Sequence, residues 1–231
     1  MDVNVRAPDL ARPAATVVVA REYENGFEVL MLKRSKVGAF AGMWVFPGGK
    51  VDEADAGDDE IVQARSAAAR EAMEEVALAI DPGDLITLSH WTPPSNARNR
   101  YATWFFVAPW LGGDITIDDH EIVGSRWISP ADAVAADLPM APPTAITLAT
   151  LADAQTFEGL KTLVLRRGVE RFETVPARLG EKLVLLWHGD AGYESADATM
   201  AGERHRMTIS STSLSDCTAS SISSYERTIG G

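Results

Sequence analysis

Three glutamates and an arginine fall within six consecutive residues, Arg70-Glu71-Ala72-Met73-Glu74-Glu75. If this segment is helical, Glu71, Glu74 and Glu75 are three or four residues apart and their carboxylates share one face. Clustered carboxylates repel one another unless water solvates them or a hard cation binds them. Mg²⁺ and Mn²⁺ prefer oxygen ligands and commonly leave water and substrate phosphates to complete the coordination shell. Two interpretations follow: a divalent-metal site for a phosphorylated substrate, or a solvated acidic helix face with an Arg70–Glu74 pair.

The helix that must position these carboxylates is predicted over 63–79, where Ala and Glu dominate and Gly and Pro are absent. Asp81-Pro82-Gly83 is expected to end it. The preceding segment, 50–62, is acidic and is predicted to be a loop. Upstream of that loop, Phe46-Pro47-Gly48-Gly49 predicts a strand that ends where two glycines break the chain. Glycines at this point let the backbone approach a ligand closely.

Strands are predicted on both sides of this helix. The first two, 14–20 and 27–34, are separated by Asn25-Gly26, which is a strong hairpin signal. Further strands are expected at 43–47, 85–91, 101–108, 122–128, 161–166, 171–176 and 182–187, and further helices from Ser129-Pro130 and over 144–154. The order of strands, helix, strands, helix and strands favours an α/β (α+β) fold, with a mixed sheet sandwiched between helices.

The composition excludes several classes of protein. The chain has 231 residues and a formal net charge of −12. Such a surface repels nucleic acid and anionic membranes, so we expect neither as a partner. Cys217 is the single cysteine, which rules out a disulfide framework, and no segment reaches the length of an apolar membrane span. We therefore expect a cytoplasmic protein that acts on a small molecule, and a homodimer is a candidate assembly.

Residues 42–78 resemble the Nudix box, in which a glycine precedes a helix carrying Arg-Glu-hydrophobic-any-Glu-Glu. The matching positions are Gly49, Arg70, Glu71, Glu74, Glu75 and Leu78. The departures are a longer loop between Gly49 and Arg70, an acidic position that either Asp55 or Glu60 fills, and Ala77 in place of a glycine. The resemblance implies the Nudix fold and hydrolysis of a diphosphate linked to another moiety, with Mg²⁺ or Mn²⁺ as cofactor.

The resemblance covers about residues 14–155. Within it, the chain is similar to one type of Nudix protein in particular. Lys33-Arg34-Ser35 and the stretch from Phe40 to Gly49 resemble the acyl-coenzyme A diphosphatase type, whose members also carry insertions in the box. We therefore expect an N-terminal lead-in over 1–13 and a Nudix hydrolase domain over 14–155. A C-terminal extension with strands and a Ser/Thr-rich tail would follow over 156–231.

The resemblance also implies roles for individual residues. The expected metal ligands are Glu71, Glu74, Glu75 and the carbonyl of Gly48. Arg70 would orient the glutamates, and either one of them or Glu121 would take the proton of the attacking water. Arg34 and Arg100 are candidates to hold substrate phosphates beside Gly48 and Gly49, although exposed arginines at strand ends are an equal interpretation.

Three functions remain open on the sequence. The first is a diphosphatase acting on coenzyme A or acyl-coenzyme A. The second is a Nudix hydrolase of ADP-ribose, a nucleotide sugar or a nucleoside triphosphate. The third is a Nudix domain that binds a ligand without turnover. Retention of all three helix glutamates argues against the third, whereas Ala77 and the longer loop keep it open.

Overall fold

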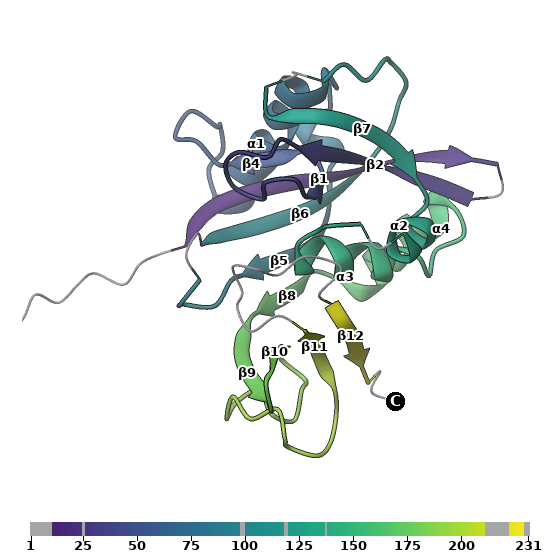
Figure 1. Ribbon diagram of the computed structural model, residues 1–231. Helices are drawn as coiled ribbons and strands as arrows, with labels where there is room; N and C mark the ends of the chain where they lie inside the picture. The colour runs from purple at the N-terminus through teal and green to yellow at the C-terminus, as the bar shows by residue number, and fades with distance from the viewer. Residues whose placement is uncertain are drawn as a thin grey trace, which may run out of the picture.

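The computed structural model describes residues 11–24, 26–97, 100–117, 120–136, 138–210 and 222–228 (Figure 1). Within these ranges, an eight-stranded mixed sheet, a four-stranded sheet and four α-helices make up the regular structure. The predicted fold, a mixed sheet between helices with added C-terminal strands, is confirmed. Most of the predicted lead-in and the part of the tail that contains Cys217 lie outside the described residues.

The large sheet is built from β1 (Arg12–Tyr23), β2 (Gly26–Arg34), β3 (Trp44–Val45), β4 (Gly48–Lys50), β5 (Ile86–Thr92), β6 (Tyr101–Pro109), β7 (Ile122–Ile128) and β8 (Glu170–Glu173). Its strand order is β3-β2-β1-β6-β5-β8, with β4 also paired to β1 and β7 also paired to β2. The β1–β6 and β5–β8 pairs are parallel. The predicted β1–β2 hairpin is present, with Tyr23 opposite Gly26.

Both faces of the large sheet are buried, and alternate residues of β1 face opposite layers. Val17 and Val19 pack in a core with the alanines of α1 (Glu60–Val76). Val18 and Ala20 belong to a second core that includes α2 (Pro130–Ala135), α3 (Pro142–Leu151) and α4 (Phe157–Arg167). In Figure 1, α1 accordingly lies across the sheet from α3 and α4. This double burial explains the continuous apolar run of β1.

Helix α1 confirms the helix predicted over 63–79, with both ends three residues earlier than predicted. Asp59 begins it, because its side chain accepts a hydrogen bond from the Val62 N–H at 2.9 Å. Ala77 ends it in the left-handed conformation, with φ of 57°. The predicted stop, Asp81-Pro82-Gly83, lies beyond the end of the helix, where Asp81 caps a separate 3₁₀ turn over Pro82–Asp84.

Gly48 and Gly49 do not break the chain as predicted; they begin β4, which pairs with β1 through Thr16 opposite Gly48. The reason is steric. A Cβ at Gly48 would collide with the backbone of Ala15 and Thr16, so a strand can run this close to β1 only without side chains.

The C-terminal part differs more from prediction. The predicted strand 161–166 is wrong, because α4 occupies Phe157–Arg167. Thr156 caps this helix by accepting from the Gly159 N–H at 3.0 Å, and Leu160 and Val164, four residues apart, are its buried side chains. The four-stranded sheet holds β9 (Val175–Leu179), β10 (Lys182–Leu186), β11 (His205–Ile209) and β12 (Ile222–Arg227), in the order β12-β11-β10-β9. No helix within the described ranges is long and apolar enough to cross a membrane.

Candidate active site

A cavity of about 2100 Å³ opens between α1, the β2–β4 segment and the C-terminal sheet. Its lining contains all the predicted site residues except Arg100: Arg34, Gly48, Gly49, Arg70, Glu71, Glu74, Glu75 and Glu121. Arg100 lies outside this lining, where its Nη2 is 3.5 Å from the Pro93 carbonyl oxygen. The structure therefore brings the acidic helix, the glycine strand and Arg34 into one site.

The alanines of α1 bring its carboxylates close to β4. Ala64, Ala68 and Ala72 are completely buried, and their small side chains let the helix lie close to the sheet. Gly49 completes this close approach, because a Cβ there would collide with the Glu71 carboxylate. Any larger residue at position 49 would displace that carboxylate.

Glu75 is the most deeply buried of the three glutamates, with a side chain 7% exposed. Its Oε2 accepts a hydrogen bond from the Gly48 N–H at 3.0 Å, and its Oε1 lies 3.5 Å from Nη1 of Arg34. Burial raises the pKa of Glu75 to about 7, although the Gly48 hydrogen bond opposes the rise and the nearby charge of Glu71 adds to it. The nearby charge of Arg34 therefore does not compensate for the burial of this carboxylate.

Arg70 lies among the acidic residues and contacts more than one of them. Its Nη1 is 3.0 Å from both Glu71 Oε1 and Glu74 Oε2. Burial raises the pKa of Glu71 even though Arg70 stabilises its ionised form. Arg70 thus contacts two of the three expected metal ligands, and its orienting role stays a prediction.

Asp55, one of the two acidic residues considered for the open position of the motif, contacts Arg70 from the other side. Its two oxygens accept from Nε and Nη2 of Arg70 at 3.0 and 3.1 Å. Burial alone would raise the pKa of Asp55, but the hydrogen bonds from Arg70 and the Asp52 N–H outweigh it and lower that pKa. Glu60, the other candidate, instead accepts from Nε1 of Trp104 at 2.9 Å.

Arg34 joins the buried Glu75 to the more exposed Glu121. Its Nη2 lies 2.5 Å from Oε2 of Glu121, whose side chain is 65% exposed. The pairing of β2 with β7, in which Arg34 is opposite Ile122, brings these distant residues together. The sequence suggested phosphate binding for Arg34 and gave no signal for this carboxylate contact.

The donor set suits a hard divalent cation, since it consists of carboxylate oxygens beside the glycine strand and two of these carboxylates have raised pKa values. In the part of the chain that the structure describes, however, no three His, Cys, Asp or Glu side chains are grouped closely enough to hold a metal ion. Arg70 and Arg34 instead pair with the glutamates. Binding of a cation would require these ion pairs to rearrange.

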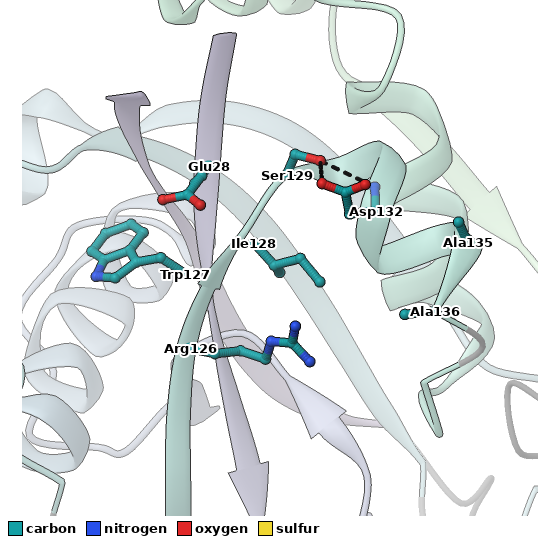
Figure 2. Close-up of a pocket in the computed structure, with 8 residues that line it drawn as sticks. All are labelled: Glu28, Arg126, Trp127, Ile128, Ser129, Asp132, Ala135 and Ala136. Carbon is teal, nitrogen blue, oxygen red and sulfur yellow. Dashed lines mark hydrogen bonds between the residues drawn. The ribbon is translucent and has the colours of Figure 1, made fainter. Parts of the chain in front are cut away.

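A smaller pocket of about 480 Å³ lies between β7, β2 and α2 (Figure 2). Its polar side chains contact protein groups. Figure 2 shows Ser129, the N-cap residue of α2, hydrogen-bonded to Asp132. Glu28 pairs with Arg21 at 2.6 Å. We assign no chemistry to this pocket.

Comparison with known proteins gives one family and many similar folds. The model of the NUDIX domain matches residues 10–151, whereas no curated protein matches the chain. A NUDIX hydrolase from Alicyclobacillus acidocaldarius is 24% identical, with a TM-score of 0.59 over 66% of this chain and 96% of that one. The NUDIX domain of Shewanella oneidensis NrtR, complexed with ADP ribose, is 19% identical, with a TM-score of 0.50 over 64% and 89%.

The family match covers more than half of the chain and contains the glycine strand and the acidic helix. The similar structures support the same fold. With Arg70, Glu71, Glu74 and Glu75 gathered at one cavity, the chain belongs to the Nudix family of pyrophosphohydrolases.

Proposed function

We propose that this enzyme hydrolyses the diphosphate linkage of coenzyme A or an acyl-coenzyme A with the help of Mg²⁺ or Mn²⁺. The observation that carries the proposal is the gathering of Glu71, Glu74 and Glu75 with Gly48 and Arg34 at one cavity. The segments that resemble acyl-coenzyme A diphosphatases support the substrate, since Arg34, Ser35 and most residues from Phe40 to Gly49 line this same cavity.

In this proposal Glu71, Glu74, Glu75 and the Gly48 carbonyl hold the divalent ion. When bound, the ion neutralises and polarises the phosphoryl oxygens. Asp55 anchors Arg70, so that Arg70 keeps Glu71 and Glu74 at the cavity wall.

The reaction itself needs a positioned water and a proton acceptor. Water attacks one phosphorus of the diphosphate, the anhydride P–O bond breaks, and the bridging oxygen leaves with the other phosphate. The proton of the water passes to a carboxylate of the cavity, either one of the helix glutamates or Glu121. Arg34, beside Glu75 and Glu121, orients these carboxylates and the substrate phosphates.

ADP-ribose is the second candidate substrate. It is supported by the similar fold of the Shewanella oneidensis NrtR domain, whose structure contains ADP ribose. It shares with coenzyme A a diphosphate attached to adenosine, so the charged end of the cavity suits both. The two candidates differ in the group attached to the other phosphate.

A substrate panel tests the proposal. The purified full chain, with Mg²⁺ or with Mn²⁺, is offered coenzyme A, an acyl-coenzyme A, ADP-ribose and a nucleotide sugar. Chromatography then follows the release of phosphopantetheine-type and adenosine bisphosphate products. Turnover of coenzyme A or its thioester well above that of the other compounds supports the proposal. Turnover of ADP-ribose alone would overturn the proposed substrate.

A matched pair of variants tests the site. Glu74→Gln should lower turnover by roughly a hundredfold or more, because it removes a ligand charge at the reacting phosphates. Glu158→Gln is the control, since Glu158 is an exposed helical glutamate that pairs with Lys161 away from the cavity. Full activity of Glu74→Gln would show that the acidic helix is not the site.

A further inference from the structure

We propose that one face of the C-terminal sheet selects an aliphatic acyl group on the substrate, which deepens the proposed function and rests on it. The face consists of Pro176 on β9 and Leu183 and Leu185 on β10, and we call it the C-terminal wall. These residues lie beyond the segment 10–151 that matches the family. They nevertheless line the same cavity as Glu71, Glu74 and Glu75.

Strand register places the three residues of the wall on the same side of the sheet. Pro176 is opposite Leu185, and Leu183 lies two residues before Leu185, so all three point to one face. The intervening residues Ala177 and Val184 are opposite each other and pack into a separate cluster on the other face. One face of the sheet thus packs in a small core of its own, although Ala177 also reaches the cavity lining, and the other face joins the main core and the cavity.

The wall is apolar and enclosed. Leu183 and Leu185 are 6% and 3% exposed and form the part of the wall that packs in the main core, whereas Pro176 is half-buried. Arg178, which is directly opposite Leu183 on the same face, is exposed and also lines the cavity. The accessible apolar surface of the wall is therefore mainly that of Pro176, and an apolar group that packs against it leaves water, which favours binding in proportion to the area buried.

The neighbouring aromatic rings favour an aliphatic group over a second base. Trp91 also lines the cavity, but it stacks on Phe172 with centroids 3.8 Å apart and rings parallel to within 1°. The rings of Trp91 and Trp187 meet edge to face, with centroids 5.7 Å apart. Since one face of Trp91 is already covered, the wall offers proline and leucine side chains, and its complement is an acyl chain of a coenzyme A thioester.

A pair of variants on β9 tests this specificity. Pro176→Glu places a carboxylate on the wall. Leu179→Glu places the same charge on the exposed end of the same strand, outside the cavity lining. We expect Pro176→Glu to lower kcat/KM for decanoyl-coenzyme A by about tenfold or more, and that for free coenzyme A by less than about twofold. Leu179→Glu should change neither value, and circular dichroism melting should show that both variants fold.

Three outcomes decide the inference. A selective loss for decanoyl-coenzyme A supports it. If Pro176→Glu lowers kcat/KM equally for both substrates, or for neither, the wall does not select the acyl group, although the proposed function stands. If the wild type hydrolyses neither compound, the proposed substrate fails and the inference fails with it. Pro176→Ser, which adds no charge, repeats the test should Pro176→Glu not fold.

Calorimetry without added metal gives a second readout that does not depend on turnover. Burial of an acyl chain against the wall predicts a more negative heat-capacity change for decanoyl-coenzyme A than for coenzyme A. Pro176→Glu should remove that difference, and Leu179→Glu should keep it. Equal heat-capacity changes for the two ligands in the wild type would contradict the inference.

Discussion

Arg70 and Arg206 each pair with carboxylates, but the balance of charge around them differs. Arg206 meets the single carboxylate of Asp190, with Nε–Oδ2 and Nη2–Oδ1 distances of 2.7 and 2.5 Å. The remaining Asp190 contacts are neutral, from the N–H groups of His205 and Gly192 at 2.9 Å. Burial alone would raise the pKa of Asp190, but these hydrogen bonds outweigh it and lower that pKa to about 2.

Around Arg70, by contrast, one guanidinium contacts Asp55, Glu71 and Glu74, and Glu75 lies nearby with Arg34. Carboxylates outnumber cations there, and the pKa values of Glu71 and Glu75 rise with burial. Removal of one partner of a buried ion pair destabilises the fold, whereas a surplus of buried acids costs stability and suits a site that binds a cation. Mutation of the Arg206 cluster should therefore affect mainly stability, and mutation of the Arg70 cluster mainly activity.

The largest expected effect is on stability. Asp190→Ala leaves Arg206 buried without its counter-ion, since Arg206 is 4% exposed. We expect a loss of about 3–5 kcal/mol in the free energy of unfolding, measured by chemical denaturation. Asp153→Ala is the control, because Asp153 is largely exposed and its pair with Arg167 spans 3.4 Å. An equal loss of stability in both variants would show that the loss does not come from the burial of the Arg206–Asp190 pair.

The next effect is on catalysis. Glu75→Gln keeps the shape of the side chain and an oxygen that accepts from the Gly48 N–H, but removes a charge. Turnover of coenzyme A should fall roughly a hundredfold or more, while the free energy of unfolding changes by less than about 1 kcal/mol. Steady-state kinetics and denaturation of the same preparation check this. A destabilised but active Glu75→Gln enzyme would reverse our reading of the site.

A third prediction concerns acid. The pKa of Asp190 is about 2 in the folded protein and near 3.8 in the unfolded chain, so its stabilising contribution is present above about pH 4. The contribution is lost as the pH falls through about 2 and amounts to about 2 kcal/mol. The stability difference between wild type and Asp190→Asn, measured at about pH 5 and about pH 2.5, should shrink at the lower value. A difference that is constant with pH would argue against the pair.

The smallest effect tests the end of the acidic helix. Ala77 has a φ of 57°, a conformation that glycine adopts without steric cost. Ala77→Gly should raise the free energy of unfolding by about 0.5–1 kcal/mol. Ala145→Gly, within the regular turns of α3, should lower it by a similar amount. Thermal melts of both variants decide the sign.

Much of this architecture could be predicted from local patterns. The β-branched run of β1, the hairpin after it and the Ala- and Glu-rich α1 are each encoded within a few neighbouring residues. Segment 161–166 was misleading, because its apolar residues suit a strand as well as a buried helix, and the Thr156 cap that settles the matter lies outside it. The close approach of Gly48 to β1 depends on a partner strand that spacing does not reveal.

The sequence pointed to most of the residues that line the cavity, Arg100 excepted, but not to their contacts. The glutamates follow from helical spacing, whereas the choice between Asp55 and Glu60 depends on the path of the long loop. The Arg34–Glu121 contact joins residues 87 positions apart, through the β2–β7 pairing. The contribution of β9 and β10 to the cavity depends on packing between distant parts of the chain.

The parallel pairing of β8 with β5 has a practical consequence for anyone who trims this chain. Ser89 to Thr92 lie opposite Glu170 to Glu173, so the large sheet includes residues well beyond the family match. A fragment that stops near residue 155 would leave β5 as a bare edge and uncover Trp91, which Phe172 now shields. An exposed edge beside an apolar surface promotes strand-to-strand association between molecules, so such a fragment should aggregate on expression.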